Sequence, residues 1–72
     1  MLTLYTKDNC VQCKMTKAVL NQYHIPYQER NISNPEYKTF LLNQNITSMP
    51  ALFKDNTFLW TGFRPDKIKQ FK

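Results

Sequence analysis

Long hydrophobic runs, glycine and cysteine are all scarce in this 72-residue sequence, and each scarcity excludes a class of protein. Apolar residues occur in runs of only a few, which are too short to cross a bilayer. The N-terminal residues lack the basic region and the apolar stretch of a signal peptide. One glycine and four prolines exclude a collagen-like chain or a flexible linker. Two cysteines are too few for the disulfide scaffold of a secreted domain. We therefore expect a cytoplasmic protein that does not bind membranes.

The composition is that of a folded protein, and the length fits one small domain that covers residues 1–72. Hydrophobic residues make up 42% of the chain, which is too many for a disordered segment. A chain of this length buries about 60% of the surface that its unfolded form exposes, so its stability is marginal and its fold must be compact. We expect this domain to be a monomer.

Positive charge exceeds negative charge: ten Lys and Arg stand against five Asp and Glu, for a net charge of +5. A basic domain can bind nucleic acid, or it can attract an acidic protein partner. Here the basic residues are scattered along the chain, and no zinc-finger or RNP-type motif is present. We therefore expect no binding to nucleic acid.

Strand and helix signals alternate along most of the chain. β-branched and aromatic residues predict a strand at 2–6, and further strands are predicted at 27–31, 51–54 and 57–61. Helices are predicted after each of the first two strands and at the C-terminal end, where Pro65 opens the last one. The first two strands should be parallel because a helix joins them, and the last two should be antiparallel because a short turn joins them. This order predicts an α/β fold in which a four-stranded mixed sheet is flanked by three helices.

The first helix carries apolar residues at helical spacing. Val11, Met15, Ala18, Val19 and Tyr23 fall at i, i+4, i+7, i+8 and i+12 on one face. We predict that this stripe is buried against the sheet as part of the core.

Capping signals mark both ends of the second helix. Ser33 and Glu36 have the spacing of a capping box, and Pro35 suits the first turn because its missing N–H costs nothing there. We predict that Ser33 starts this helix. No glycine follows its last turn, so an asparagine within residues 43–45 should take the left-handed conformation that ends many helices.

Cys10 and Cys13 form a CxxC pair, which is the most informative feature of the sequence. A lone CxxC can be half of a zinc site, a redox dithiol or an accident. Structural zinc needs four ligands, and the chain offers only these two cysteines and His24. A zinc or iron–sulfur site would have to be shared between chains, so we expect no metal. We interpret His24 as a cap or surface residue at the end of the first helix.

The position of the pair favours redox chemistry, because it lies where the first strand passes into the first helix. Cys10 would cap the helix and Cys13 would lie in its first turn, where free backbone N–H groups stabilise a thiolate. Lys7 and Lys14 add positive charge nearby. Cys10 is the less hindered of the two cysteines, so we interpret it as the nucleophile that attacks a disulfide. Cys13 then acts as the resolving thiol that releases the reduced target.

Two segments of the sequence resemble the signature segments of the NrdH-redoxins, small glutaredoxin-like proteins that behave as thioredoxins. These are the stretches Lys7–Lys17, which contains Cys-Val-Gln-Cys, and Trp60–Asp66, which reads Trp-Thr-Gly-Phe-Arg-Pro-Asp. The resemblance implies a thioredoxin/glutaredoxin fold and thiol–disulfide oxidoreductase activity. It also implies reduction by thioredoxin reductase with electrons from NADPH, and electron donation to the disulfide-bearing tail of the large subunit of a class Ib ribonucleotide reductase. The implied redox group is the Cys10–Cys13 disulfide, with no bound cofactor.

The resemblance also implies a binding surface around the cysteines. It places a cis proline at Pro50, and the backbone of Met49 would then be free to pair with an extended substrate strand. Gly62 is the only glycine, so its position should need a positive φ or a close backbone approach. Trp60 can complete the core or dock a partner. The expected partner-binding residues are Lys7, Val11, Gln12, Met49, Pro50, Gly62, Phe63 and Arg64.

Two alternative functions remain open at this point. The first is a glutathione-dependent glutaredoxin. Glutaredoxins hold glutathione with a Gly-Gly turn after the last strand, whereas here Thr61 replaces the first glycine and Pro65 removes an N–H. We therefore expect poor reduction by glutathione, although Arg64 could pair with one of its carboxylates. The second alternative is a non-enzymatic module that binds metal or nucleic acid.

Overall fold

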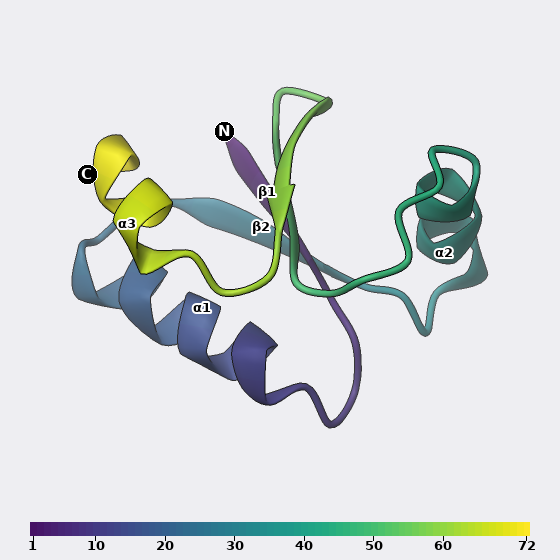
Figure 1. Cartoon of the computed structure of the whole chain (residues 1–72), viewed down its shortest axis with the longest axis horizontal. Coiled ribbons are helices and arrows are strands. Elements are labelled where there is room, and N and C mark those ends of the chain that lie inside the picture. The colour runs from purple at the N-terminus through teal and green to yellow at the C-terminus, as the bar shows by residue number, and fades with distance from the viewer.

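The computed structural model describes all 72 residues, Met1–Lys72, and contains a four-stranded sheet with helices on both faces (Figure 1). Its elements in chain order are β1 (Leu2–Thr6), α1 (Val11–Gln22), β2 (Tyr27–Asn31), α2 (Pro35–Leu42), β3 (Ala51–Lys54), β4 (Thr57–Thr61), α3 (Pro65–Ile68) and a final 3-10 turn (Lys69–Phe71). All four strands occupy the predicted ranges, and the predicted α/β fold is confirmed. No helix has both the length and the apolar character needed to cross a membrane.

The sheet has the strand order β2-β1-β3-β4. β1 pairs in parallel with β2, while β1–β3 and β3–β4 are antiparallel, as the connections predicted. Asp55 and Asn56 form the turn between β3 and β4, and both have positive φ angles, of 49° and 70°. Such angles are typical of the tight turns that join hairpin strands, because they match the twist of the strands.

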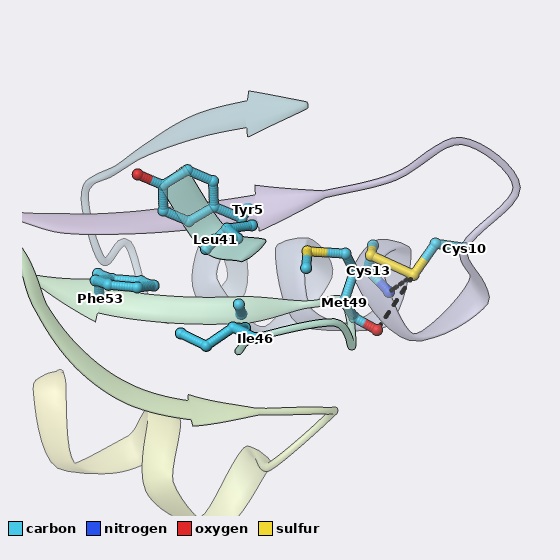
Figure 2. Close-up of a cluster of buried hydrophobic side chains, with 8 residues drawn as sticks. Tyr5, Cys10, Cys13, Leu41, Ile46, Met49 and Phe53 are labelled. Atoms are coloured by element: carbon cyan, nitrogen blue, oxygen red, sulfur yellow. Dashed lines mark hydrogen bonds between the residues drawn. A yellow bond between two sulfur atoms is a disulfide. The ribbon is translucent and has the colours of Figure 1, made fainter. Parts of the chain in front are cut away.

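The core has two parts, one on each face of the sheet, because successive residues of a strand point to opposite faces. α1 and α3 cover one face and α2 covers the other (Figure 1). Under α1 and α3, Leu20 and Ile68 pack with residues of β1, β3 and β4. Under α2, the ring of Tyr5 lies 5.2 Å from that of Phe53, and Leu41 belongs to the same cluster (Figure 2).

The predicted buried stripe of α1 is wrong over its first two turns. Val11 is 71% exposed and Met15 is 41% exposed, and Ala18 is exposed as well. Val19 and Tyr23 lie at the edge of the core and are half-buried. The apolar residues chosen for the stripe therefore do not mark the face that packs on the sheet.

The buried face of α1 consists of Cys13, Thr16 and Leu20. Thr16 is fully buried, and its hydroxyl donates a 2.8 Å hydrogen bond to the carbonyl oxygen of Gln12, one turn earlier. A buried hydroxyl without such a partner would be costly, but this one is satisfied within the helix. A stripe chosen by apolarity alone passes over Thr16, which is why the prediction selected the wrong face.

The start of α2 also differs from the prediction, because Asn34 caps the helix and Ser33 does not. The Asn34 side chain accepts a 2.9 Å hydrogen bond from the N–H of Glu36. Pro35 is the cause: a proline disfavours the helical conformation in the residue before it, and that residue takes the extended geometry of an N-cap. The end of the helix agrees with the prediction, since Asn45 has a φ of 59°.

Candidate active site

Strand pairing brings three loops together at one end of the sheet. Tyr5, near the end of β1, pairs with Ala51 at the start of β3, and Ala51 pairs in turn with Thr61 at the end of β4. The loop that leaves β1, the loop that enters β3 and the loop that leaves β4 therefore meet. These loops carry the segments around residues 10, 50 and 62, which are far apart in the sequence.

Cys10 is the N-cap of α1 and Cys13 lies in its first turn, as predicted. The two sulfurs are joined in a disulfide, with the Cα atoms 5.2 Å apart. The N–H of Cys13 points at the sulfur of Cys10 across 3.1 Å (Figure 2). No acidic residue lies in the first turn of the helix. The dipole of α1 and the N–H of Cys13 therefore both favour negative charge on the Cys10 sulfur once the disulfide is reduced.

An open groove of about 560 Å³ runs past this end of α1, and it exposes one cysteine only. Its lining residues are Lys7, Asn9, Cys10, Val11, Gln12, Thr47, Ser48, Met49, Thr61 and Gly62. Cys13 is absent from this lining and is 2% exposed, whereas Cys10 is 7% exposed. A group bound in the groove therefore reaches Cys10 first.

The loop before β3 places its backbone against the disulfide. The Met49–Pro50 peptide bond is cis, as predicted. The sulfur of Cys10 lies 3.9 Å from the carbonyl oxygen of Met49 (Figure 2). The N–H of Met49 makes no hydrogen bond within the chain. This edge of the groove thus offers an unused backbone donor beside the Cys10 sulfur.

The loop after β4 is tied to the loop before β3 and to the first turn of α1. Gly62 has a φ of 89°, which confirms the predicted positive angle, and its N–H donates a 2.8 Å hydrogen bond to the carbonyl oxygen of Pro50. The N–H of Phe63 donates to Oε1 of Gln12, in the first turn of α1, across 3.3 Å. The side chain of Gln12 thereby connects the dithiol helix to the loop.

Some of the expected binding residues lie away from the groove. Arg64 is exposed, precedes α3 and places its Nε 3.8 Å from Oδ1 of Asp66. Phe63 is half-buried and reaches the site only through its backbone contact with Gln12. Trp60 is 8% exposed and packs in the core under α1 and α3.

Four groove residues were missed by the sequence analysis, namely Asn9, Thr47, Ser48 and Thr61. Asn9 and Thr61 lie within the two signature segments, and Thr47 and Ser48 are the two residues before Met49. Nearness in the chain to predicted site residues was therefore the one signal that could have found them. His24 is exposed and takes a φ of 55° just after α1. No group of three or more His, Cys, Asp or Glu side chains is placed to hold a metal ion.

A CxxC disulfide at a helix N-terminus, facing a cis proline at the end of a four-stranded mixed sheet, defines a thiol–disulfide oxidoreductase of the thioredoxin fold. Comparison with known proteins gives the same class. A sequence model of the glutaredoxin family matches residues 2–59. Glutaredoxin-like protein NrdH of Lactococcus lactis subsp. cremoris is 38% identical over 69 residues, which cover 94% of each chain.

Further relatives come from Escherichia coli. The Glutaredoxin-like protein NrdH of strain K12 is 31% identical over 70 residues, or 96% of this chain and 85% of that protein. The solved structure of an Escherichia coli NrdH-redoxin, described as glutaredoxin-like with a thioredoxin-like activity profile, superposes with a TM-score of 0.88 and 30% identity. The match covers 99% of this chain and 93% of that one. The chain therefore belongs to the glutaredoxin family and, within it, to the NrdH-redoxins.

Proposed function

We propose that this protein carries electrons from a thioredoxin reductase to the disulfide of a class Ib ribonucleotide reductase. The observation that carries this proposal is the groove that exposes Cys10 and shields Cys13, with an unused backbone donor at Met49 along its edge. A groove of this kind suits an extended protein segment that carries a disulfide. The NrdH names of the relatives support the particular target.

The first step is attack by Cys10 on the disulfide of the target. A free cysteine with a pKa near 8.5 is only about 3% thiolate at pH 7, so the site must stabilise the thiolate to react quickly. The N-cap position, the N–H of Cys13 and the absence of acidic residues in the first turn provide that stabilisation. The Cys10 thiolate forms a bond to one target sulfur, and the other target sulfur leaves as a thiolate.

The groove holds the target while this exchange takes place. An extended segment lying along residues 47–49 can hydrogen-bond to the free N–H and the carbonyl oxygen of Met49. Such backbone pairing is the usual way that an extended peptide is held beside an exposed edge. Lys7 lines the same groove, so an acidic segment would also find a positive charge there.

The second step is attack by Cys13 on the Cys10 sulfur of the mixed disulfide. The Cys10–Cys13 bond forms, the bond from Cys10 to the target breaks, and the target leaves fully reduced. The two Cα atoms are 5.2 Å apart, so the bond closes within one helical turn. A reductase dithiol then reverses the oxidation of the pair.

The loop after β4 favours a protein reductant over glutathione. Glutathione is an anion with two carboxylates, and a loop holds such groups with free backbone N–H groups. Here the N–H of Gly62 is used by Pro50, the N–H of Phe63 is used by Gln12, and Pro65 has none. Each missing charge-assisted hydrogen bond costs roughly 1.5–3 kcal/mol, so losing two weakens binding by about two orders of magnitude or more.

The test compares two electron sources for the same enzyme. Turnover of a class Ib ribonucleotide reductase is measured with NADPH and thioredoxin reductase, and then with NADPH, glutathione reductase and millimolar glutathione. We expect turnover with the first source and little with the second. Comparable rates from the two sources would place the protein among the glutathione-dependent glutaredoxins. Reduction by thioredoxin reductase without turnover of the ribonucleotide reductase would point to a different target.

A further inference from the structure

A second, smaller cavity borders the disulfide and shares Lys7, Asn9 and Cys10 with the groove. Its volume is about 180 Å³, and both cysteines line it. Its charged lining residues come from three elements: Lys7 and Asp8 from the loop after β1, Lys14 and Lys17 from α1, and Glu29 from β2. The buried Cys13 and the carboxylate of Glu29, a residue of the sheet, therefore line the same polar cavity.

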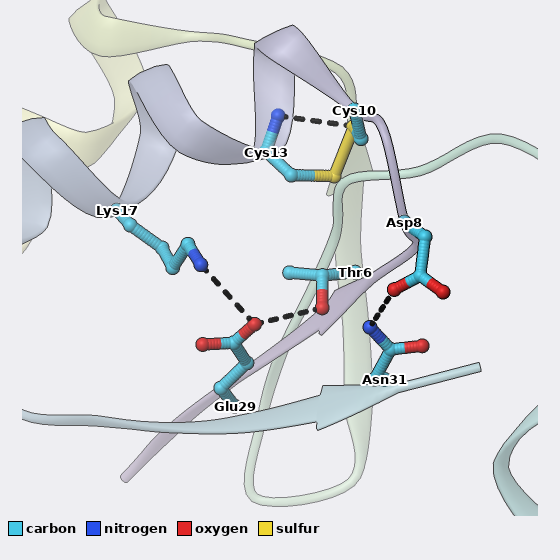
Figure 3. A network of polar contacts seen from close by, with 7 residues as sticks. All are labelled: Thr6, Asp8, Cys10, Cys13, Lys17, Glu29 and Asn31. Carbon is cyan, nitrogen blue, oxygen red and sulfur yellow. Dashed lines mark hydrogen bonds and ion pairs between the residues drawn. A yellow bond between two sulfur atoms is a disulfide. The ribbon is translucent and has the colours of Figure 1, made fainter. Parts of the chain in front are cut away.

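Glu29 is held in one place by two partners on different elements (Figure 3). The hydroxyl of Thr6, which is 2% exposed, donates a 2.9 Å hydrogen bond to its Oε2. The ammonium group of Lys17 lies 3.3 Å from the same oxygen. The second carboxylate oxygen, Oε1, makes no hydrogen bond within the chain. Glu29 is therefore anchored through one oxygen and has the other free to accept a proton.

Cys13 needs a proton acceptor that the groove does not supply. It must lose its thiol proton before it can attack the mixed disulfide, because the thiolate and not the thiol is the nucleophile. Its 2% exposure removes it from bulk water, and the groove lining does not include it. The 180 Å³ cavity is polar and has room for water molecules that bridge its walls. A proton leaving Cys13 can therefore travel through this cavity.

We propose that Glu29 is the proton acceptor for Cys13 in the second step of the exchange. The Cys13 thiol passes its proton through water in the cavity to Glu29, and the resulting thiolate attacks the Cys10 sulfur. The Cys10–Cys13 bond forms as the bond from Cys10 to the target breaks. The electron pair of the broken bond leaves on the target sulfur, which takes up a proton from solvent, and Glu29 returns its proton to water. This inference rests on the proposed role of Cys13 as the resolving thiol.

Asp8 is the other carboxylate of the cavity and serves as the matched control. Its Oδ1 accepts a 3.1 Å hydrogen bond from the side chain of Asn31. Asp8 lies on the exposed loop before Cys10. The Glu29 side chain is also exposed, at 37%, but its carboxylate is joined to the buried Thr6. If the net charge of the cavity were all that mattered, Asp8→Asn and Glu29→Gln would act alike, because each removes one negative charge.

The experiment follows the two steps separately by stopped flow. The reduced protein reacts with an excess of an aromatic disulfide that releases a coloured thiol, first on attack by Cys10 and again on resolution by Cys13. In Glu29→Gln we expect the first phase to stay within about twofold and the second to slow by about tenfold to a hundredfold at pH 7. Glu29→Asp should recover part of the loss. The defect should shrink toward alkaline pH, where hydroxide ionises the thiol directly.

The outcomes separate this inference from the proposed function. The unchanged first phase serves as the folding control within the same molecule, so slowing of both phases together would count against a specific role for Glu29. An unchanged second phase in Glu29→Gln, or equal slowing in Asp8→Asn, would overturn the inference and leave the roles of Cys10 and Cys13 intact. Release of the first thiol by Cys13, found by blocking Cys10, would instead overturn the assignment on which the inference rests.

Discussion

The N–H of Gly62 donates a 2.8 Å hydrogen bond to the carbonyl oxygen of Pro50, and this contact joins the loop after β4 to the loop before β3. With the bond from Phe63 to Gln12, it joins these two loops to the first turn of α1, which carries the disulfide. The same two bonds use the backbone donors that could otherwise hold a glutathione carboxylate. One set of contacts therefore supports the groove and, under the proposed function, also disfavours glutathione as the electron source.

Gly62→Ala should destabilise the fold through its backbone alone. A Cβ at this position would lie 3.7 Å from Oε1 of Gln12, which is an ordinary contact, but the φ of 89° is strained for alanine. We expect a loss of about 1–2 kcal/mol in the free energy of unfolding, measured with urea. Asn56→Gly, at a position whose φ is already 70°, is the control and should be close to neutral. Equal stability of Gly62→Ala and the unmodified protein would contradict the strained geometry.

Asn34→Ala and Ser33→Ala form a matched pair that tests the start of α2. The Asn34 side chain caps the N–H of Glu36, so its removal should lower the free energy of unfolding by about 1 kcal/mol. Ser33 uses only its backbone N–H, which donates to Oδ1 of Asn31 and survives the substitution. Ser33→Ala should therefore stay within about 0.5 kcal/mol of the unmodified protein. A larger loss in Ser33→Ala than in Asn34→Ala would mean that Ser33 caps the helix, as the capping box predicts.

Leu20→Ala and Met15→Ala test which face of α1 packs on the sheet. Leu20 is fully buried among residues of β1, β3 and α3, so truncation should cost about 2–5 kcal/mol, enough to unfold much of a domain this small. Met15 is 41% exposed, and its truncation should change the free energy of unfolding by about 0.5 kcal/mol or less. Both values come from denaturant titrations followed by circular dichroism. A large loss in Met15→Ala would mean that α1 packs on the sheet through the predicted apolar stripe.

Cys13→Ser should trap a mixed disulfide on Cys10. The attack step survives in this variant because Cys10 still lines the groove, while the resolving thiol is gone. Mass spectrometry after incubation with the large subunit of the ribonucleotide reductase should find a target peptide joined to Cys10. The reciprocal Cys10→Ser variant should form no stable adduct. An adduct on Cys13 in that variant, with none on Cys10 here, would reverse the two roles.

The order of strands and helices could be predicted from the sequence because its signals are local. A run such as 2–6 is recognised as a strand from its own residues, and Asp55 and Asn56 suffice to predict a hairpin. The CxxC at the junction of a strand and a helix predicts a thiolate at a helix N-terminus for the same reason. The positive φ of Gly62 could also be predicted, because Gly62 is the only glycine in the sequence.

Two sequence predictions, the cap of α2 and the buried face of α1, were wrong because another interaction outweighed the local rule that each one used. The capping box pointed to Ser33, but Pro35 restrains the residue directly before it and makes Asn34 the cap. The apolar stripe of α1 pointed to Met15, but the sheet packs against Thr16, whose hydroxyl is satisfied within the helix. The backbone restraint from Pro35 decided the first outcome and a hydrogen bond within the helix decided the second, and residue polarity alone reports neither.

The sequence by itself determined the element order, the CxxC pair and the class of chemistry, since each depends on residues close together in the chain. Only the tertiary structure decided what surrounds that pair. The pairing of β1 with β3 brings Met49 to Cys10, and the pairing of β1 with β2 brings Glu29 to the cavity beneath Cys13. These neighbours are 39 and 16 residues apart from their cysteines, distances over which a helical or strand period carries no information. Long-range strand pairing, and not local pattern, therefore positions the groups that surround the redox pair.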